Sequence, residues 1–491
     1  MRIACVGGGP GGLFFSTLVA EAMPDAEVTL FERNARDDAF GFGVVFSDAT
    51  LRQIDAADPV LHQALEDHGV HWDPIQVRAH GRSTEFAGNG MAAIYRKTLL
   101  HLLQERAGSA GVDLRFGSSV TLADLDEFDV VVAADGANST IVRAIAAAVA
   151  PSVDTATAKF IWFGTTHLFD GLTFIHEKNE HGVFAAHCYP ISDQLSTFIV
   201  ETDEATWRRA GLDGFDTTTA PGPSDTRSQD YLERLFAGHL DGGTLVANNS
   251  RWANFRTIRS ESWHQGRVVA LGDAVHTAHF SVGSGTKMAM EDADALSRAL
   301  ASSPGDLEAA FTAYESERMP LVARIQNSAG PSLSWWEHFG EYFDALEPEQ
   351  FPFHFFSRTI AIDKIEKRDA RLVQDIRAWW RSGAGTDASA SPLSGLSLQA
   401  RVLSRHDPSL EKTTRVHAPD GISGLEAAVS SAIGARSPGV TVAGGTPFTR
   451  VRLSEELRLR HGLTTVIEEP DASDALAETL VLSGRADAVA R

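Results

Sequence analysis

A glycine-rich hexapeptide near the N-terminus, GGGPGG at residues 7–12, constrains the fold of this chain more than any other stretch. It follows the short apolar run RIACV and opens the apolar, helix-like stretch LFFSTLVAEAM. Gly7, Gly9 and Gly12 match the spacing G-x-G-x-x-G, in which glycines allow a tight turn, close approach of a pyrophosphate and close helix–strand packing. Free amides at the start of the helix favour phosphate. The stretch therefore predicts a Rossmann-like α/β domain that binds a dinucleotide.

An acidic residue stands where such a domain needs one. The run EVTLFER is typical of a second strand and reaches Glu32 twenty residues after Gly12. A carboxylate at this point can bind a ribose 2′-hydroxyl, and we count the adjacent Arg33 among the cofactor-binding residues. An acidic rather than a basic residue favours an adenosine without a 2′-phosphate. A chance glycine turn is the alternative for the hexapeptide alone, but the strand, helix and carboxylate together disfavour it.

Two later buried-strand patterns also end in glycine and aspartate. They are VVVAADG at residues 130–136 and RVVALGD at residues 267–273, and a glycine-broken loop follows the second. The carboxyl ends of such strands meet at one edge of the sheet, where ligands bind. Carboxylates there can accept hydrogen bonds from ribityl hydroxyls, and glycines let amides approach a flavin ring. The predicted FAD-binding residues of these segments are Asp135, Gly136, Gly272, Asp273, Gly283 and Gly285.

The composition argues against several other classes of protein. With 65 acidic and 43 basic residues, the chain lacks the basic stripe that displaces counterions from nucleic acid. Its two cysteines, Cys5 and Cys188, cannot build a disulfide framework or a cysteine-rich metal site, so no metal is expected. The sequence has neither an eighteen-residue apolar run nor a charged leader before an apolar segment, so we expect a cytoplasmic protein with no membrane partner.

The three fingerprints, in this order, resemble those of the group A flavoprotein monooxygenases, the single-component aromatic hydroxylases related to 4-hydroxybenzoate hydroxylase. The resemblance implies that Asp273 contacts the flavin ribityl chain and that Asp135 lies where FAD and the nicotinamide donor are both served. Arg96, in AAIYRKTLLHLL, matches the family arginine that opens a helix and reaches the FAD phosphates; a helix-surface arginine is the alternative. No second strand-preceded glycine fingerprint occurs, as in this group, which binds NADH or NADPH only transiently.

Longer stretches resemble one branch of the family, the salicylyl-CoA 5-hydroxylases and the monooxygenase half of 2-aminobenzoyl-CoA monooxygenase/reductase. The likeness covers roughly residues 1–381 and includes DDAFGFGVVFSDATL and QNSAGPSLSWWEHFGEYF. The chain departs from the hydroxybenzoate-type pattern at Gly41-Phe42, where that type has an arginine, and in HTAHFSVG, where a proline is replaced. Both changes fit the CoA-thioester branch and weaken any transfer from the hydroxybenzoate enzymes.

The segment of residues 156–254 alternates apolar and polar side chains, as in FIWFGTT and LSTFIVET. This period of two predicts half-buried antiparallel strands, one face of which makes the substrate pocket. Polar side chains expected to face the pocket, each with a structural role as the alternative, are His167, His176, His187, Tyr189 and His279. Core candidates, one of which can instead stack on the substrate ring, are Trp162, Phe163 and Phe174. The predicted substrate-binding residues are Phe42, Val44, His167, Phe174 and Tyr189.

The resemblance also implies the chemistry. NADH or NADPH reduces FAD, O₂ adds to form a flavin C4a-hydroperoxide, and an electron-rich ring carbon takes its distal oxygen. The site must exclude water and hydrogen-bond the phenol or aniline of the substrate, and a histidine with a near-neutral pKa suits this role. The catalytic candidates are His279 and His187. Candidate CoA-binding arginines, with solvated surface as the alternative, are Arg208, Arg209, Arg256 and Arg259.

We therefore expect ring hydroxylation of an aryl-CoA thioester of the salicyloyl-, 2-aminobenzoyl- or hydroxyphenylacetyl-CoA type. Three alternatives stay open: repeated oxygenation that dearomatises such a thioester in secondary metabolism, hydroxylation of a free aromatic, and an FAD-binding protein that oxygenates nothing. A homodimer is also left open.

The C-terminal part resembles pieces of a different flavoprotein, the Old Yellow Enzyme-type barrel. GLSLQARVLSR resembles its entry strand and GGTPFTRVRLSEELRLRHGLTTVI its last strand–helix units, but only about 45 residues separate these pieces, where the middle of the barrel needs about 250. Ala400 replaces the usual asparagine, and the catalytic His/Asn pair has no counterpart. We expect a remnant without FMN that packs as a small appendage or an oligomer contact. A chance similarity of short α/β segments is the alternative.

The expected fold class is α/β. A Rossmann-like FAD-binding domain, an inserted antiparallel-sheet substrate domain, C-terminal helices and a small α/β appendage follow from the patterns above. The expected boundaries are 1–155 and 255–330 for the FAD-binding domain, 156–254 for the substrate domain, 331–381 for the helices, 382–395 for a linker and 396–491 for the appendage.

Overall fold

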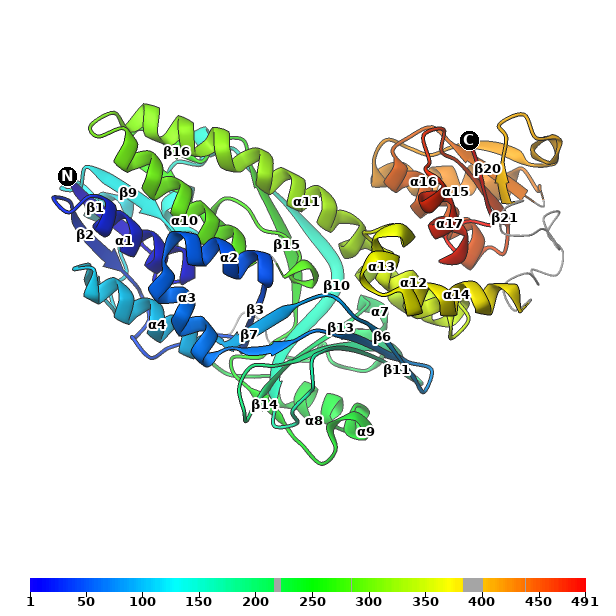
Figure 1. Cartoon of the computed structure of the whole chain (residues 1–491), viewed down its shortest axis with the longest axis horizontal. Helices are drawn as coiled ribbons and strands as arrows, with labels where there is room; N and C mark the ends of the chain where they lie inside the picture. Colours follow the sequence, from blue (N-terminus) through cyan, green and yellow to red (C-terminus); the bar gives the residue numbers. More distant parts are fainter. Residues whose placement is uncertain (216–221, 284, 383–400, 438) are drawn as a thin grey trace. The chain divides into compact units, whose positions relative to one another are not determined.

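The computed structural model describes residues 1–215, 222–283, 285–382, 401–437 and 439–491, which form two compact units (Figure 1). The first unit comprises Met1–Asp73, Gly90–Thr173 and Ala185–Leu333, and the second comprises Pro74–Asn89, Phe174–Phe184 and Ser334–Arg491. Two short inner segments, residues 74–89 and 174–184, belong to the second unit, and the expected domain boundaries stay a prediction. The expected linker, residues 382–395, lies outside the described residues apart from Ser382.

The first unit contains a six-stranded sheet in the order β16-β17-β9-β1-β2-β8. All strands but the short β16 pair in parallel. The central strands are short runs of valine, alanine and isoleucine with buried side chains, as expected for a parallel sheet covered by helices. Its strands are β1 (Arg2–Val6), β2 (Glu27–Phe31), β8 (Asp113–Arg115), β9 (Val130–Ala133), β16 (His264–Gln265) and β17 (Val268–Ala270).

Helices α1 and α10 pack against each other beside this sheet (Figure 1). Pro10 opens α1, where its fixed φ suits the first helical position and its missing amide is not needed. The remaining helices of this part include α11, which continues from the first unit into the second. The bounds are α1 (Pro10–Ala22), α2 (Asp48–Ala57), α3 (Pro59–His68), α4 (Arg96–Ser109), α5 (Thr140–Ala144), α6 (Ala146–Val149), α10 (Gly285–Ser302) and α11 (Leu307–Ala345).

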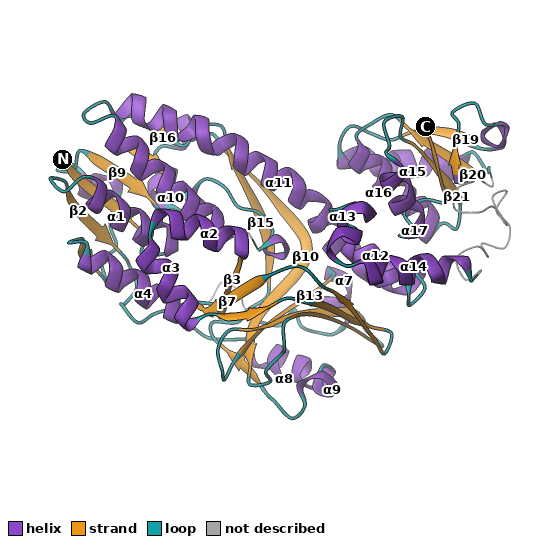
Figure 2. Ribbon diagram, viewed as in Figure 1, coloured by secondary structure: helices purple, strands orange, loops and turns teal. Residues whose placement is uncertain are grey.

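An antiparallel sheet forms the other part of the first unit, in the strand order β14-β10-β13-β12, with β15 also paired to β10. Figure 2 shows its long strands apart from the helix-covered parallel sheet. The mixed α/β class with an inserted antiparallel sheet is as expected. Its strands and helices are β10 (Pro151–Thr165), β12 (Gly182–Pro190), β13 (Ser196–Thr202), β14 (Leu245–Ala247), β15 (Ala253–Ser260), α7 (Glu204–Arg209), α8 (Thr226–Leu235) and α9 (Ala237–Leu240), and a small sheet adds β3 (Gly43–Ser47), β4 (Val70–Trp72) and β7 (Met91–Tyr95).

The second unit holds a five-stranded parallel sheet in the order β18-β22-β21-β20-β19. The first of these strands in the chain pairs with the last, as in a closed (β/α)₈ barrel, and a helix links each following pair of strands. The topology is that of a barrel sector; its Old Yellow Enzyme-type origin stays a prediction. The bounds are β18 (Val402–Leu403), β19 (Thr414–His417), α15 (Leu425–Gly434), β20 (Gly439–Ala443), α16 (Pro447–Glu455), β21 (Thr464–Glu468), α17 (Asp474–Leu482) and β22 (Ala488–Ala490).

Helices and a hairpin complete the second unit, where β5 pairs with both β6 and β11. An aromatic core includes Trp335 and Trp336 of α11 and Phe351, whose rings lie 5.0–5.7 Å apart in neighbouring pairs. The bounds are β5 (Ile75–Ala79), β6 (Arg82–Phe86), β11 (Leu172–Asn179), α12 (Gln350–Phe356), α13 (Ile362–Arg368) and α14 (Ala370–Arg381).

A buried charge cluster centred on Glu455 joins the α12 region to α16 inside this unit. The carboxylate lies 3.2 Å from Nε2 of His354, accepts a 2.8 Å hydrogen bond from Tyr342 and pairs with Arg452 and Arg485 at 2.7 and 3.2 Å. Burial alone would raise the pKa of Glu455, but His354 and the arginines outweigh it and lower this pKa. Burial also lowers the pKa of His354 to about 4.

Among the residues that the structure describes, every helix is too short or too polar to cross a membrane. No group of three or more histidine, cysteine or acidic side chains among them is arranged to hold a metal ion.

Candidate active site

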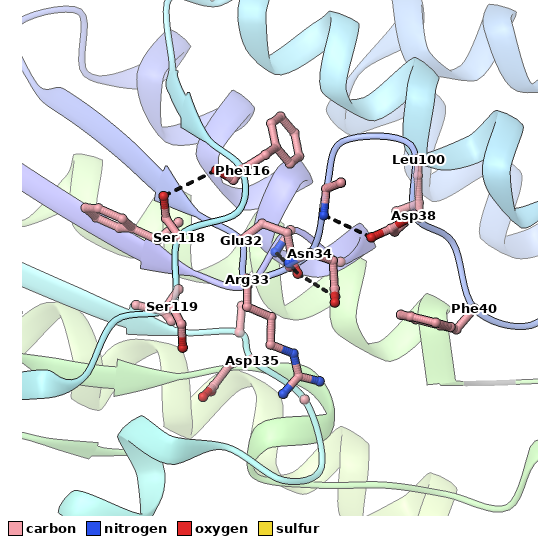
Figure 3. A pocket seen from close by; sticks show the side chains of 18 of the residues that line it. Glu32, Arg33, Asn34, Asp38, Phe40, Leu100, Phe116, Ser118, Ser119 and Asp135 are labelled. Atoms are coloured by element: carbon pink, nitrogen blue, oxygen red, sulfur yellow. Dashed lines mark hydrogen bonds between the residues drawn. The ribbon is translucent and has the colours of Figure 1, made fainter. Parts of the chain in front are cut away.

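A recess opens at the carboxyl edge of the six-stranded parallel sheet (Figure 3). It encloses about 1050 Å³, including its solvent-filled mouth. The β1–α1 turn, the end of β2, the start of α4 and the β9–α5 turn all contribute to its wall. The structure thus brings together segments far apart in the sequence, as expected if the carboxyl ends of these strands meet at one edge of the sheet. Of the predicted cofactor residues, the recess is lined by Gly7, Gly9, Glu32, Arg33, Arg96, Asp135 and Gly136.

The glycines of the β1–α1 turn are needed for two different reasons. Gly7 has a φ of +117°, and a Cβ there would lie 2.2 Å from the carbonyl oxygen of Ala134 on the neighbouring strand. A Cβ at Gly12 would lie 2.1 Å from the carbonyl oxygen of Gly7. At Gly9, in contrast, a Cβ would meet nothing within 4 Å, and no side chain caps the helix that follows. The turn is therefore open at Gly9, and no side chain caps the first amides of α1, as a pyrophosphate site requires.

Glu32 is fixed at the wall of the recess by the backbone around it. Its Oε2 accepts a 2.7 Å hydrogen bond from the amide of Gly8, and its Oε1 accepts two from Asn34, at 2.8 and 2.7 Å. The carboxylate thus ties the end of β2 to the glycine turn. Arg33 beside it is exposed, and Figure 3 shows it projecting into the recess near Asp135.

Asp135 leaves a buried acceptor unused. Its Oδ2 accepts hydrogen bonds from the amide and hydroxyl of Thr140, at 2.7 and 3.1 Å. Its Oδ1 is buried and meets no donor among the residues that the structure describes. An unsatisfied buried acceptor costs about 1–3 kcal/mol, and a ligand hydroxyl or amide in the recess would remove that cost. The adjacent Gly136, with φ +79°, turns the chain at this point.

Arg96 supplies positive charge to the recess. It begins α4, and its amide donates a 2.7 Å hydrogen bond to the carbonyl of Phe42. In the described part of the chain, its guanidinium makes no hydrogen bond or ion pair, and burial lowers its pKa while the nearby Asp273 and Tyr189 act in the opposite sense. A desolvated cation without a carboxylate partner suits a bound phosphate. Together with the open amides of α1 and the unused oxygen of Asp135, it makes the recess fit FAD.

Asp273 lies in a neighbouring turn and does not line this recess. Solvent reaches the Asp273 side chain. The protein packed around it nevertheless desolvates the carboxylate and raises its pKa, and the nearby His276 and Arg96 oppose this shift. Its loop is anchored by Asp292 of α10, which accepts a 3.0 Å hydrogen bond from the amide of Gly272 and lies 2.6 Å from His276. Predicted cofactor residues that the recess does not include are Gly12, Gly272, Asp273, Gly283 and Gly285.

A second group of candidate residues shares one face of the antiparallel sheet. Ala185 of β12 lies opposite Glu201 of β13, and His187 lies opposite Ile199. Side chains two residues apart on a strand point to the same side, so His187 and Glu201 are diagonal neighbours on that face. By the same register, the residues on this face are Phe160, Trp162, His187, Tyr189, Ile199 and Glu201. Phe163, fully buried, lies on the opposite face.

Glu201 links the two histidines predicted to be catalytic. Its Oε1 lies 2.7 Å from Nε2 of His187, and its Oε2 lies 3.7 Å from Nε2 of His279. All three side chains are at most 3% exposed. Glu201 was not among the predicted residues, although one signal was present: it is the only acidic residue in STFIVET, a strand buried along its whole length.

Aromatic rings surround this group of charges. The ring of Phe280 lies 4.2 Å from that of His279 and 5.6 Å from that of His187, and Phe160 and Phe255 lie 5.1 and 6.1 Å from Phe280. Apolar rings lower the local dielectric and keep water away, which strengthens the electrostatic interactions inside. The face is therefore suited to an aromatic substrate with one polar ring substituent.

Phe42 and Tyr189 meet beside this face, whereas Val44 does not join them. The two aromatic residues share an apolar cluster with Trp72, and the Tyr189 hydroxyl donates a 3.3 Å hydrogen bond to the carbonyl of Gly43. Burial raises the pKa of Tyr189. Val44 packs in the core of the parallel-sheet domain, and the neighbouring Val45 packs with the Phe42 cluster instead.

Three other predicted pocket residues lie elsewhere. His167 follows the end of β10, where its ring meets Phe169 edge-on at 4.6 Å. Phe174 and His176 belong to the aromatic core of the second unit, with rings 5.6 and 6.1 Å from that of Trp336. Burial lowers the pKa of His176 to about 3, so it stays neutral at physiological pH. Phe174 and His176 thus belong to a different compact unit from His187.

The four candidate CoA-binding arginines have different surroundings. Arg208 pairs with Glu204 at 2.5 Å and Arg259 with Asp154 at 2.7 Å, on exposed surface. Arg209 donates to the Thr206 hydroxyl at 2.9 Å. Arg256 is also exposed, and it donates a 2.9 Å hydrogen bond to Asn138, a residue of the recess wall.

Comparison with known proteins adds three findings. The FAD binding domain family matches residues 127–329. A salicyloyl-CoA 5-hydroxylase from Streptomyces sp is 53% identical over an alignment that covers 100% of this chain and 99% of that protein. The 3-hydroxy-4-methyl-anthranilyl-[aryl-carrier protein] 5-monooxygenase of Streptosporangium sibiricum is 36% identical, covering 68% of this chain and 89% of its own length.

The fold has counterparts among solved structures. The tetrameric form of 2-methyl-3-hydroxypyridine-5-carboxylic acid oxygenase superposes with a TM-score of 0.55 at 20% identity, covering 68% of this chain and 92% of that one. At this identity the likeness concerns the fold.

Proposed function

Since this chain belongs to the FAD-dependent aromatic monooxygenases, in the family of the salicyloyl-CoA 5-hydroxylases, we propose that it adds one oxygen atom to the ring of an aryl-CoA thioester. The observation that carries the proposal is the 53% identity along the whole chain. The aryl group is of the salicyloyl or 2-aminobenzoyl type, because an electron-donating hydroxyl or amino group prepares the ring for oxygenation. NADH or NADPH and O₂ are the co-substrates.

When bound, FAD supplies two kinds of chemistry: it takes up electrons from the nicotinamide, and it activates O₂ for transfer of a single oxygen atom. The chain's own residues hold it. The open amides of α1 and the Arg96 guanidinium bind the pyrophosphate, Glu32 accepts hydrogen bonds from the adenosine ribose, and Oδ1 of Asp135 accepts one more from the cofactor. No FMN is needed for this reaction.

The sheet face positions the substrate. The rings of Phe160, Trp162 and Phe280 exclude water from the aromatic group, and His187 hydrogen-bonds its ring hydroxyl or amino group. A neutral imidazole can take the proton of that group, which makes the ring more electron-rich. The thioester tail leaves this sheet face toward solvent. Of the four candidate arginines, Arg256 is the one that donates a hydrogen bond to Asn138 of the recess wall.

Purified FAD-loaded protein tests the proposal. NADH and NADPH consumption, O₂ uptake and H₂O₂ release are followed with salicyloyl-CoA, 2-aminobenzoyl-CoA, salicylate, 2-aminobenzoate and benzoyl-CoA. We expect salicyloyl-CoA or 2-aminobenzoyl-CoA to accelerate consumption with little H₂O₂ and to gain one oxygen atom by mass. Two added oxygens would replace the proposal by repeated oxygenation. Acceleration by a free acid alone would replace it by hydroxylation of a free aromatic.

A carrier-bound thioester is a second candidate substrate. It is favoured by the relative from Streptosporangium sibiricum, whose name specifies an aryl-carrier protein. The comparison is direct: the same aryl group is offered on CoA and on a phosphopantetheinyl carrier domain. A higher kcat/KM for the carrier form would select this second candidate.

A further inference from the structure

One indole on the face of the antiparallel sheet has an unused hydrogen-bond donor. Trp162 of β10 shares this face with His187 and Tyr189 of β12. Its Nε1 is buried and meets no acceptor among the residues that the structure describes. An indole N–H can donate a hydrogen bond but cannot accept one. A buried donor without an acceptor costs free energy, and a bound molecule that offers an acceptor recovers it.

Apolar side chains surround this indole. The ring of Phe280 lies 6.4 Å from that of Trp162, and Trp162 packs against the apolar cluster that contains Phe42 and Tyr189. Two residues further along the strand, Gly164 leaves room for Phe42, since a Cβ there would lie 2.6 Å from the Phe42 ring. The rings of Phe42 and Phe280 have no oxygen to offer the indole. The donor therefore borders an aromatic chamber rather than a polar network.

The strand register relates Trp162 to the histidine proposed to bind the ring substituent. Trp162 and His187 both lie opposite Ile199, on the two strands that flank β13. Two strand spacings separate their backbones, or about 10 Å, so one substituted aromatic ring can contact both side chains. Both rings also border Phe280, at 6.4 and 5.6 Å. A substrate held at one substituent by His187 can therefore reach Trp162 with the neighbouring substituent.

The charged groups on this face favour a neutral acyl group over a free carboxylate. The paired residues of β10, β12 and β13 on the face include Glu201, which is 1% exposed, and no lysine or arginine. A buried free carboxylate needs a cation or several donors to offset its desolvation. A thioester carbonyl is neutral, and a single N–H can satisfy it. The acyl group next to the ring hydroxyl or amino group of the proposed substrates is such a carbonyl.

We propose that the indole N–H of Trp162 donates a hydrogen bond to the thioester carbonyl oxygen of the substrate and thereby selects aryl thioesters. Together with His187 at the ring hydroxyl or amino group, it holds the ring by two neighbouring substituents and so fixes the orientation of the ring in the chamber. Trp162 is a specificity-determining residue, and no bond is made or broken at its side chain. The inference rests on the proposed function.

The test compares two ligands that differ only at the carbonyl. Salicyloyl-CoA carries it, whereas S-(2-hydroxybenzyl)-CoA has a methylene in its place and keeps the ring, the hydroxyl and CoA. Binding to the oxidised, FAD-loaded enzyme is followed by flavin absorbance without nicotinamide. We expect the wild type to bind salicyloyl-CoA at least about tenfold more tightly than the analogue. In Trp162→Phe we expect the two Kd values to lie within about twofold of each other, because phenylalanine keeps an apolar ring without the donor.

The ratio of the two Kd values separates a hydrogen bond from packing. If Trp162→Phe weakens both ligands equally and keeps the wild-type ratio, the indole acts by packing alone and the inference is overturned. Trp252→Phe is the matched control: Trp252 is 5% exposed and donates its indole N–H to the Ser228 hydroxyl at 2.7 Å. We expect this variant to lose stability and to keep the wild-type ratio. A ratio that collapses in both variants also overturns the inference.

The wild type alone keeps the inference testable if Trp162→Phe fails to retain FAD. In protein labelled with ¹⁵N at its tryptophan indoles, we expect one indole N–H resonance to move downfield with salicyloyl-CoA and not with the methylene analogue. If no indole resonance distinguishes the two ligands, or if the wild type binds both equally, the inference alone is overturned. If the wild type binds neither salicyloyl-CoA nor 2-aminobenzoyl-CoA, the proposed function fails, and the inference with it.

Discussion

The two parallel sheets of this chain differ in the charged groups at their carboxyl edges. At the carboxyl edge of the sheet that contains β1, β2 and β9, glycines leave a recess whose Arg96 guanidinium and Asp135 Oδ1 have no partner in the described residues. At the same edge of the second sheet, Glu468 ends β21 and pairs with Arg415 at 2.5 Å. The next residue, Glu469, pairs with Arg450 of α16 at 2.5 Å. The first edge is left for a ligand, and the protein's own ion pairs occupy the second.

The difference shows that a parallel sheet does not by itself make a site. Both sheets are built from short apolar strands joined by helices, and both have glycines with positive φ where a strand meets its helix, as at Gly7 and Gly444. What differs is whether the charged groups at the edge form ion pairs with one another. Function therefore depends on a few side chains placed on a common architecture.

The largest expected effect concerns the second sheet. Glu455→Gln leaves Arg452 and Arg485 buried without their carboxylate, and we expect the second unit to lose about 3–5 kcal/mol of stability. FAD affinity should stay within about twofold, because Glu455 belongs to the sheet without a recess. Hydrogen exchange over residues 334–381 and FAD titration measure the two effects. If Glu455→Gln lost FAD affinity while residues 334–381 kept their hydrogen-exchange protection, the second sheet would contribute to FAD binding, contrary to the comparison above.

Next in size is a change at the glycine turn of the first sheet. Gly7→Ala places a Cβ 2.2 Å from the Ala134 carbonyl oxygen at φ +117°, so we expect FAD to bind at least about 100-fold more weakly. The control is Gly444→Ala at the end of β20, where φ is +68° and the Cβ approaches a His417 ring atom at 2.6 Å. That variant should lose stability and keep FAD. Equal loss of FAD in both variants would contradict the assignment of the recess.

The third effect is a dependence of stability on pH in the second unit. His176 has an ordinary pKa near 6.5 when unfolded and about 3 when folded, so the unfolded chain binds more protons and stability falls as the pH drops below 6.5. Between pH 7 and pH 5 this histidine alone should cost about 2 kcal/mol. His176→Phe, which suits the aromatic cage, should remove that part of the loss in thermal unfolding. An undiminished acid sensitivity would show that other groups cause it.

The smallest effect sharpens the comparison at a single charge. Arg96→Met removes the unpaired cation of the first edge, and we expect FAD to bind about tenfold more weakly, or about 1.4 kcal/mol. Arg450→Met, at the second edge, breaks the pair with Glu469 and should lower the thermal unfolding midpoint without affecting FAD. Isothermal titration of the apoprotein with FAD measures both. If Arg450→Met weakened FAD binding more than Arg96→Met did, the second edge rather than the first would be the cofactor site.

The recess was predictable because its signals are local. Gly7, Glu32 and Asp135 each stand at a strand end, and parallel strands bring such ends to one edge without further information. The His187–Glu201–His279 group was only half predictable. The histidines stood out by type, but Glu201 joins them through a diagonal contact that depends on strand register, which the sequence does not specify.

Other misplacements have the same cause. Val44 and Val45 differ by one residue along a strand, and one residue decides which face a side chain occupies. Phe174 and His176 carry the pattern of a substrate-domain strand, but their strand passes into the second unit, where Trp335 and Trp336 surround His176. Long-range packing of this kind leaves no local pattern.

The strand order of the second sheet also bears on how the chain folds during synthesis. β22 is the last of the five strands to leave the ribosome, yet it lies between β18 and β21. Until it emerges, β18 has no neighbour and β21 exposes an unpaired edge, the kind of surface that invites aggregation or chaperone binding. Nascent chains halted before residue 488 should therefore be far more prone to aggregate than the finished protein.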